Sequence, residues 1–447
     1  MYNSIIEKIK DKNICILGFG REGRSTYNFI RRHLSNKFLT IIDKNYVFEN
    51  FNDSNANLIY GEDYLNNLDE YDLIIKTPGI SLNDIDISNI KEKITSQMSL
   101  ILDVFNSQII GITGTKGKST TSSLMYKILK DQGYDAYLLG NIGNSIFDDI
   151  ENFNEKTYLV IEMSAHQLEY INLSPHIGMV LNLYEDHLDH AKTVEHYHEN
   201  KMNMFKYQKE GDFAIYSKDD INTINQINKN NYLSNIYSVT LKNNNSLNSI
   251  YLDNDDIILN NEILYNKNNE RSLLGEHNLS NIMFCLTASK LLNLNIDKVC
   301  ESIKNFIPLE HRLEKVGTFN EVTYYNDSIS TIPMATINAV EALKDVNTLI
   351  FGGMDRGIDY LPLVEYLKKC NVENLICMPT TGYKIGKLIE NKNVYYIETL
   401  KEAVSLAKKI TKKNTICLMS PAASSYEYFK NFEEKGTEFK RLVKEDN

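Results

Sequence analysis

The residues Gly111-Ile112-Thr113-Gly114-Thr115-Lys116-Gly117-Lys118-Ser119-Thr120 form the stretch from which the fold is most readily inferred. The run Ile109–Ile112 predicts a short buried strand, and apolar residues recur at helical spacing after Ser119. A strand, a glycine loop, Lys-Ser-Thr and a helix are together typical of a phosphate-binding loop, because backbone N–H groups and the helix N-terminus face the phosphates. The spacing departs from GxxxxGK[ST], since Ile112 stands five residues before Gly117. An ordinary glycine turn that opens a helix is the alternative.

The side chains of this loop suit a nucleoside triphosphate. Lys118 would neutralise the β- and γ-phosphates, and the hydroxyl of Ser119 or Thr120 would be a ligand of Mg²⁺. The loop residues expected to line ATP are Gly114, Thr115, Lys116, Gly117, Lys118, Ser119 and Thr120.

Length and composition set the class of the protein. A chain of 447 residues is too long for one ordinary core and predicts about three domains. Its 42% hydrophobic and 24% charged residues are typical of a soluble globular protein. The sequence holds no apolar run of about eighteen residues and no signal-peptide core at its start. We therefore expect a cytoplasmic protein without membrane insertion.

Cysteine spacing and net charge disfavour two kinds of site. The six cysteines show no CxxC spacing, and Cys15, Cys377 and Cys417 lie within apolar strand patterns. Buried, reduced thiols are expected rather than disulfides or zinc ligands. The formal net charge is −11 without a long basic block, which disfavours nucleic acid as a partner. An acidic protein can still carry a local cationic pocket for an anionic small molecule.

The first segment has the pattern of a dinucleotide-type βαβ unit. Strand Ile14–Leu17 leads into Gly18-Phe19-Gly20-Arg21-Glu22-Gly23, and a helical stretch is followed by strand Phe38–Ile42 and Asp43. The glycine turn can accept a diphosphate, although the motif alone does not imply NAD. A further strand, Leu73–Ile75, runs into the rigid turn Lys76-Thr77-Pro78-Gly79-Ile80.

In the second segment, polar residues follow several strands of a predicted parallel sheet. Strand Tyr158–Ile161 ends in Glu162, and strand Ile177–Leu183 leads into Glu185-Asp186-His187. Ligands of such sheets bind beyond the carboxyl ends of the strands, so Gly114, Glu162 and His187 can converge. Glu162 is a candidate Mg²⁺ ligand, with a helix-capping role as the alternative. His187 could ligate a metal or orient a phosphate, unless this is only a surface cluster of titrating groups.

A third α/β segment begins near Pro308. Its predicted strands are Leu349–Phe351, Leu375–Met378, Val394–Ile397 and Ile416–Met419. The fold class is therefore α/β with three domains: a Rossmann-like domain at 1–97, a P-loop ATPase-like parallel sheet at 98–307, and a second Rossmann-like domain at 308–447. Residues 235–273 predict a β-hairpin excursion from the central sheet.

Taken in order over essentially the whole chain, these motifs resemble the Mur ligase family, ATP-dependent enzymes that extend the peptide of the cell-wall precursor. Within the family, the loop after Ser420 and the Phe429–Glu433 segment are most similar to the member that adds D-glutamate to UDP-N-acetylmuramoyl-L-alanine. The motifs that carry the resemblance are Gly18-x-Gly20-x-x-Gly23, Thr77-Pro78-Gly79, Gly114 to Thr120, Gly140-Asn141-Ile142-Gly143, Glu162-Met163-Ser164, Asn182 to Asp189, Gly275-Glu276-His277-Asn278 with Asn281, His311-Arg312, Asn326-Asp327-Ser328, Gly352 to Arg356 and Ser420 to Ser424.

The resemblance implies a role for each matching position. Lys118, Lys201 and His187 would be the catalytic residues, and Lys201 would be carbamylated by CO₂, which turns a cation into an oxygen ligand. The nucleotide-sugar substrate would lie at Gly18, Gly20, Gly23, Asp43, Thr77, Gly79 and Asn141. ATP would also contact Asn281, Arg312 and Asp327, glutamate would be held by Thr331, Arg356, Ser425 and Phe432, and the metal ligands would be Ser119, Glu162, His187 and Lys201.

The implied activity is an amide ligase of peptidoglycan precursor synthesis that uses ATP and Mg²⁺. It would join glutamate to UDP-N-acetylmuramoyl-L-alanine through an acyl phosphate, as a monomer. Three motifs depart from the common pattern: Lys116 replaces Asn, Ile329 and Ser330 replace Lys-Ala, and Arg356 replaces Lys. Two of these departures touch the amino-acid pocket, so a related member that adds L-glutamate or another amino acid is an alternative.

Two more distant alternatives make different predictions. The Gly-x-Gly-x-x-Gly turn argues against a folylpolyglutamate synthetase, and the loop after Ser420 argues against the alanine-adding family member. A P-loop regulator with a redox-sensing dinucleotide domain would bind NAD and would release no phosphate in response to an amino acid.

Overall fold

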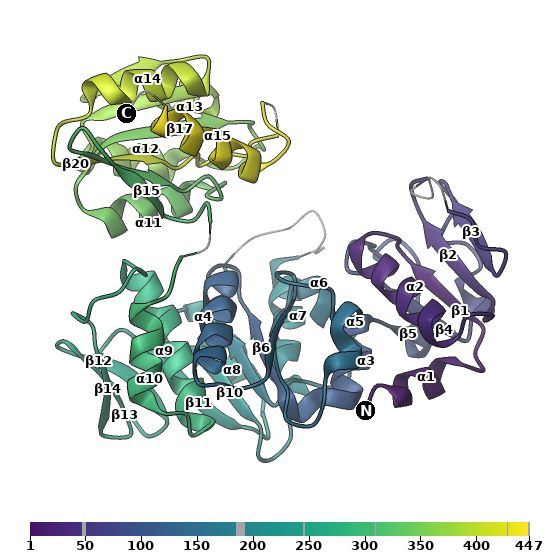
Figure 1. Ribbon diagram of the computed structural model, residues 1–447. Coiled ribbons are helices and arrows are strands. Elements are labelled where there is room, and N and C mark those ends of the chain that lie inside the picture. Colours follow the sequence, from purple (N-terminus) through teal and green to yellow (C-terminus); the bar gives the residue numbers. More distant parts are fainter. Residues whose placement is uncertain (47–50, 185–192, 245, 309, 427, 446–447) are drawn as a thin grey trace. The chain divides into compact units, whose positions relative to one another are not determined.

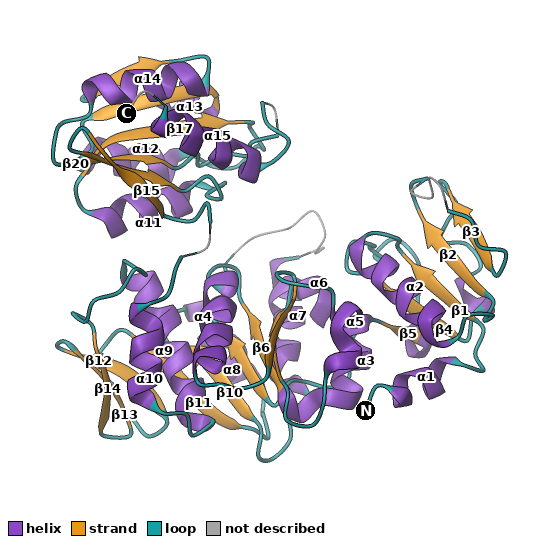
Figure 2. Cartoon of the chain, in the orientation of Figure 1, coloured by secondary structure: helices purple, strands orange, loops and turns teal. Residues whose placement is uncertain are grey.

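Three sheets organise the part of the chain that the computed structural model describes, namely residues 1–46, 51–184, 193–244, 246–308, 310–426 and 428–445. Each of the three predicted segments holds one sheet, and the α/β class is confirmed (Figure 1; Figure 2). The chain divides into two compact units. Residues 1–270 and 280–304 form the first unit, with two of the sheets, and residues 271–279 and 305–447 form the second. No helix among the described residues is long and apolar enough to cross a membrane.

The first sheet is entirely parallel, with the order β3-β2-β1-β4-β5 that is typical of Rossmann-like folds. All residues of β1, β2 and β4 are buried, as expected for strands with both faces covered. Its elements are α1 (Asn3–Ile9), β1 (Ile14–Leu17), α2 (Arg21–His33), β2 (Leu39–Asp43), β3 (Ala56–Tyr60), β4 (Leu73–Lys76) and β5 (Ile94–Thr95).

The second sheet has nine strands in the order β14-β13-β12-β11-β10-β9-β6-β8-β7. Its strands from β7 to β12 are parallel, and β12, β13 and β14 are antiparallel. The excursion predicted over residues 235–273 therefore begins later than expected, because β11 pairs in parallel with both of its neighbours. The strands are β6 (Ile109–Thr113), β7 (Ala136–Gly140), β8 (Tyr158–Glu162), β9 (Ile177–Val180), β10 (Phe213–Ser217), β11 (Asn235–Thr240), β12 (Ser249–Asp253), β13 (Asp256–Leu259) and β14 (Glu262–Asn266). The helices are α3 (Gln97–Phe105), α4 (Lys118–Asp131), α5 (Ile146–Asp149), α6 (Ala165–Leu168), α7 (Val194–Lys206), α8 (Ile221–Lys229), α9 (Glu276–Leu291) and α10 (Ile296–Lys304).

The third sheet has the order β15-β16-β20-β17-β18-β19, parallel except for the β15–β16 pair. Two apolar clusters show that α11, α12 and α13 cover one face and that α14 and α15 cover the other. The strands are β15 (Glu314–Phe319), β16 (Val322–Asn326), β17 (Val346–Gly353), β18 (Asn374–Thr380), β19 (Asn393–Tyr396) and β20 (Thr415–Met419). The helices are α11 (Pro333–Leu343), α12 (Leu361–Lys369), α13 (Thr381–Gly386), α14 (Leu400–Ile410) and α15 (Phe432–Lys444).

Strand β9 is shorter than the sequence predicts. The apolar run extends to Leu183, but the strand ends at Val180. The backbone then leaves the sheet, because the N–H of Leu181 donates to the carbonyl of Thr113 and the carbonyl of Asn182 accepts from the N–H of Thr115. The expectation of a strand through Leu183 was therefore wrong, since these residues pair with the glycine loop instead. Cys15, Cys377 and Cys417 are buried free thiols, as predicted.

Replacing Gly23 with Ala should destabilise the first unit, because the new Cβ would overlap the carbonyl oxygen of Gly18. Overpacking of this kind costs about 1–3 kcal/mol. The matched control is Gly20→Ala, in the same turn, where a Cβ meets nothing within 4 Å. It should cost less than about 1 kcal/mol. Urea denaturation followed by circular dichroism measures both, and equal losses would contradict the packing argument.

Candidate active site

The glycine loop lies between the carboxyl end of β6 and the first turn of α4, as predicted. Gly117 precedes the helix with a φ of 87°, a left-handed conformation that favours glycine. A Cβ on Gly117 would come within 2.6 Å of Asn281 Oδ1, so Asn281 of α9 lies against the loop. Backbone N–H groups and the amino end of a helix of 14 residues therefore form one anion-binding turn.

The loop is held by the segment that follows β9. The side chain of Asn182 makes two hydrogen bonds to the backbone of Lys116. Its Oδ1 accepts from the Lys116 N–H at 2.8 Å, and its Nδ2 donates to the Lys116 carbonyl at 3.0 Å. The N–H of Tyr184 donates to Thr115 Oγ1 at 2.9 Å. Lys118 Nζ stays within the loop and donates to the carbonyls of Gly114 and Thr115 at 2.8 and 3.1 Å. The loop conformation is thus held by hydrogen bonds within the chain.

Glu162 supplies a buried carboxylate at the neighbouring strand end. It is the last residue of β8 and only 2% exposed. Its Oε1 accepts from Asn141 Nδ2 at 3.2 Å, whereas Oε2 has no hydrogen-bond partner among the described residues. Thr120 Oγ1, in the first turn of α4, is buried and also lacks one within the described chain. Unpartnered buried oxygens are unfavourable in a protein interior and are the ligand type that Mg²⁺ prefers, so these residues fit a divalent cation.

Lys201 is buried beneath the glycine loop. It lies on α7, is 1% exposed, and donates from Nζ to the carbonyl of Gly114 at 3.0 Å. Its Nζ lies 3.5 Å from Thr113 Oγ1, which itself donates to the carbonyl of Met163 at 2.7 Å. Helix α7, the loop and the end of β8 therefore meet around Lys201. Of the other predicted metal ligands, Ser119 lies in the first turn of α4, and His187 lies outside the described residues, within 185–192.

The glycine turn of the first sheet is closed by residues predicted to bind the nucleotide sugar. Asp43 Oδ2 accepts from the N–H of Phe19 at 2.7 Å, and the N–H of Gly18 donates to the carbonyl of Ile42 at 2.7 Å. A Cβ on Gly18 would overlap Thr77 Oγ1, so Thr77 lies directly on the turn. The structure gathers Gly18, Gly23, Asp43 and Thr77, whereas Gly79 is exposed two residues further on.

In the second unit, Asp327 joins three segments. The carboxylate is buried and accepts from Ser420 Oγ at 2.7 Å and from the N–H of Leu313 at 3.1 Å. Burial raises the pKa of Asp327 to about 6, and the nearby charge of Arg312 and the hydrogen bonds act in the opposite direction. Asp327 and Arg312, both predicted to contact ATP, are thus close to each other in this unit.

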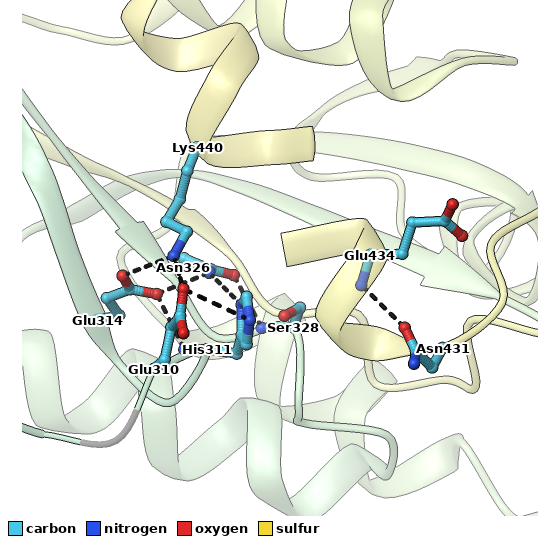
Figure 3. A network of polar contacts seen from close by, with 8 residues as sticks. All are labelled: Glu310, His311, Glu314, Asn326, Ser328, Asn431, Glu434 and Lys440. Carbon is cyan, nitrogen blue, oxygen red and sulfur yellow. Dashed lines mark hydrogen bonds and ion pairs between the residues drawn. The ribbon is translucent and has the colours of Figure 1, made fainter. Parts of the chain in front are cut away.

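Lys440 of α15 reaches Glu310 and Glu314, on either side of Arg312 in the sequence (Figure 3). Lys440 Nζ donates to Glu314 at 3.0 Å and to Glu310. The N–H of His311 and Asn326 Nδ2 donate to Glu314 Oε2 at 2.9 and 3.0 Å. Glu310, His311 and Glu314 are close enough to share a metal ion, but the Lys440 ammonium already bridges the two carboxylates and compensates one of their two charges. This network fixes the backbone on either side of Arg312.

The residues predicted to hold glutamate all lie in the second unit, and one of them belongs to α15. Phe432 is its first residue, with its ring centroid 6.1 Å from that of His311. The N–H of Met354 donates to the carbonyl of Ser424 at 2.9 Å, which brings together the loops that carry Arg356 and Ser425. Ser425 Oγ is buried without a hydrogen-bond partner in the described part of the chain. Thr331 follows the Asp327 loop and is half-buried.

Comparison with known proteins decides the family. Residues 112–289 match the Mur ligase middle domain, and residues 311–423 match the Mur ligase, glutamate ligase domain. A protein of Clostridium kluyveri named UDP-N-acetylmuramoylalanine--D-glutamate ligase is 34% identical over 97% of this chain and 97% of its own length. The chain belongs to the Mur ligase family.

Further members support this assignment. A ligase of the same name from Clostridium botulinum (strain Loch Maree / Type A3) is 33% identical over 97% of each chain. The solved structure of MurF ligase from Thermotoga maritima in complex with ADP gives a TM-score of 0.60 at 16% identity, covering 98% of this chain and 97% of that one. The solved structure of MurC from Thermotoga maritima gives a TM-score of 0.57 at 15% identity, covering 98% of this chain and 100% of that one. These two structures show the same fold. The predicted ATP-binding ligase of peptidoglycan synthesis is confirmed at the level of the family.

Sequence reasoning missed the supporting residues of this Mur ligase site. Asn182 fell inside the predicted strand Ile177–Leu183, and its place at the start of the Asn182–Asp189 motif was the only signal for its role. Gln167 accepts from the N–H and the hydroxyl of Ser164 in a capping box, which is a recognisable Ser-x-x-Gln pattern. Arg21 and Glu22 were seen only as variable positions of the glycine turn.

Replacing Asp327 with Asn should change stability in a pH-dependent way. Because the folded pKa is near 6 and the ordinary value is 3.8, the unfolded chain loses this proton first, so ionisation opposes folding as the pH rises from 4 to 6. The free energy of unfolding of Asp327→Asn, relative to that of the wild type, should therefore rise by up to about 3 kcal/mol between acidic and neutral pH. The rise is about 1.4 kcal/mol for each pH unit between the two pKa values. Calorimetry of the full chain at several pH values measures this. A difference that stays constant with pH would contradict the raised pKa.

Proposed function

We propose that this Mur ligase is UDP-N-acetylmuramoyl-L-alanine:D-glutamate ligase (MurD). The observation that supports this member above others is the similarity to relatives of that name, which extends over nearly the whole length of both chains. It includes the second unit, where the amino acid is predicted to bind. The solved structures that share the fold include other family members at low identity, so they do not bear on the choice of amino acid.

The reaction has two steps. A carboxylate oxygen of UDP-N-acetylmuramoyl-L-alanine attacks the γ-phosphorus of ATP, the bond from phosphorus to the ADP oxygen breaks, and an acyl phosphate forms. The amine of glutamate then attacks the acyl carbon, loses a proton, and expels phosphate as the amide forms. The free carboxylate is a poor electrophile, and phosphorylation supplies its leaving group. Catalysis therefore consists mainly of positioning and charge stabilisation.

Residues of the first unit act on the phosphoryl transfer. The N–H groups of the glycine loop orient the phosphates, and the Lys118 ammonium, which lies at this loop, neutralises charge on the β- and γ-phosphates. Glu162, the hydroxyl of Ser119 and the carbamate of Lys201 are the proposed ligands of Mg²⁺, together with His187. A cation held by these residues would neutralise charge on the transferring phosphoryl group. Asn141 orients Glu162 and faces the substrate.

Residues of the second unit hold the amino acid. The forked guanidinium of Arg356 can donate two hydrogen bonds to one carboxylate of glutamate. Ser425 Oγ, buried without a partner among the described residues, can donate to the second carboxylate. Glutamate carries two carboxylates, so a site with these donors selects it over an apolar amino acid. Thr331 and Phe432 complete this site.

Phosphate release tests the activity and its amino-acid preference. With UDP-N-acetylmuramoyl-L-alanine and ATP, release should depend on D-glutamate within a panel of D- and L-amino acids. Preference for L-glutamate would assign the related family member instead. NAD binding without release in any combination would refute the ligase.

Replacing Lys118 with Met should lower kcat at least about 100-fold, because it removes a cation that acts on the transition state. The matched control is Lys127→Met, on the outer face of the same helix, where Lys127 pairs with Asp131 at 2.9 Å. Loss of an exposed pair of this kind should leave kcat within about twofold. Undiminished glutamate-dependent release of ADP by Lys118→Met would exclude the proposed role.

Lys201→Ala tests the carbamate. Carbamylation joins the neutral amine to CO₂ and releases one proton, so the product is an anion. The variant should lose activity at least about 100-fold and should regain part of it with added acetate or formate, which replace the missing oxygen ligand. Lys206→Ala, at the exposed end of the same helix, is the control and should need no rescue. Full activity of Lys201→Ala without a carboxylate would refute the carbamate.

A further inference from the structure

Two adjacent residues of the glycine turn reach the central sheet. Arg21 opens α2, and its Nη2 donates to the carbonyl of Gly140 at 2.7 Å, while Nη1 lies 3.4 Å from the carbonyl of Gly143. These carbonyls belong to the first and last residues of the Gly140–Gly143 turn, and the predicted substrate residue Asn141 lies between them. Arg21 therefore fixes the backbone of the turn on both sides of Asn141.

Glu22 reaches the segment after Glu162. Its Oε1 accepts from Gln167 Nε2 at 2.6 Å. Gln167 Oε1 in turn accepts from the N–H of Ser164 at 2.9 Å and from its hydroxyl at 3.1 Å. The amino end of α6, two residues after Glu162, is thus tied to the glycine turn by a chain of two side chains.

Both connections end at the same pair of residues. The N–H of Asn141 donates to the carbonyl of Glu162 at 3.1 Å, and Asn141 Nδ2 donates to Glu162 Oε1 at 3.2 Å. Arg21 holds the Asn141 side of this pair, and Glu22 holds the Glu162 side through Gln167. Helix α2 also packs on α5, where the ring centroids of Phe29 and Phe147 lie 4.6 Å apart. A displacement of the turn is therefore transmitted to the pair rather than absorbed by a loose interface.

We propose that Arg21 and Glu22 are positioning residues that couple occupation of the glycine turn to the geometry of Asn141 and Glu162. A nucleoside-diphosphate ligand in the turn would lie against the backbone of both residues and would fix the two connections. The carboxylate that faces the metal-nucleotide site would then be oriented only when the acid substrate is present. This inference rests on the proposed function, because it takes the nucleotide sugar as the ligand of the turn.

The test is a binding cycle on the full chain. Calorimetry measures the Kd of Mg²⁺ with a non-hydrolysable ATP analogue, with and without saturating UDP-N-acetylmuramoyl-L-alanine. The wild type should bind the analogue at least about fivefold more tightly when the nucleotide sugar is present, and linkage requires the same factor in the reverse order. In Arg21→Met and Glu22→Gln the factor should fall to near one, while each ligand alone binds within about threefold of the wild type. Arg21→Lys should restore part of the factor.

Arg32→Met is the matched control. Arg32 lies on the same helix and reaches α5 and the residues just after it, donating to the carbonyl of Phe147 at 2.9 Å and to Glu151 at 2.8 Å. It does not bond the Gly140–Gly143 turn, so the coupling factor should stay at the wild-type value. Circular dichroism of each variant checks that the fold is retained.

Four outcomes would count against the proposal. An unchanged factor in Arg21→Met and Glu22→Gln would overturn it, as would equal loss in Arg32→Met. Weaker binding of the nucleotide sugar alone, with the factor intact, would overturn it in favour of direct contact between Arg21 and the diphosphate. A wild type that binds both ligands without coupling would overturn this inference and leave the proposed function intact, whereas a wild type that does not bind the nucleotide sugar would refute the proposed function itself.

Discussion

The hydrogen bonds between the glycine loop and the segment after β9 are the constraint on which the first unit depends. A glycine-rich loop has many accessible conformations, and fixing it costs backbone entropy. Asn182 offsets this cost by bonding both backbone groups of Lys116, and Thr115 is bonded through its N–H and its hydroxyl. Because Lys201 donates to Gly114, and Asn281 lies against Gly117, a displaced loop would displace both.

Buried polar groups divide into two classes in this protein. Asp327 is buried and accepts hydrogen bonds from the N–H of Leu313 and from Ser420 Oγ, which hold segments of the second unit together. Glu162 Oε2, Thr120 Oγ1 and Ser425 Oγ are buried without hydrogen-bond partners among the residues described. An unpartnered buried oxygen lowers stability by roughly 1–3 kcal/mol, which a folded chain tolerates where a ligand later supplies the partner. Their location at a strand end, in the first turn of a helix and in a loop agrees with that explanation.

The sequence predicts those parts of the structure that depend on local pattern. Apolar runs located β1, β6, β8 and β20 to within one residue or so, and the glycine loop was found from its own residues. The rest depends on partners distant in the chain. Strand β9 ends early because the backbone groups of Leu181 and Asn182 form hydrogen bonds with Thr113 and Thr115. Asp43 accepts a hydrogen bond from Phe19, which lies 24 residues before it in the chain. Residues 271–279 pack with the second unit, although they precede its first strand. No periodicity marks such contacts.

Glu22 poses an electrostatic question, because a carboxylate in a turn that accepts a diphosphate should repel its ligand. The structure answers it by the direction of the side chain. Burial raises the pKa of Glu22, and the hydrogen bond from Gln167 together with the charges of Arg21 and Lys76 acts to lower it. Lys76 is itself buried at the end of β4, and the charges of Glu22 and Glu169 partly oppose the lowering of its pKa by burial. The negative charge of Glu22 is thus compensated by charges within the protein, so it repels a diphosphate in the turn only weakly. Because Glu22 is also hydrogen-bonded to Gln167 of α6, it can transmit a displacement of the turn to that helix.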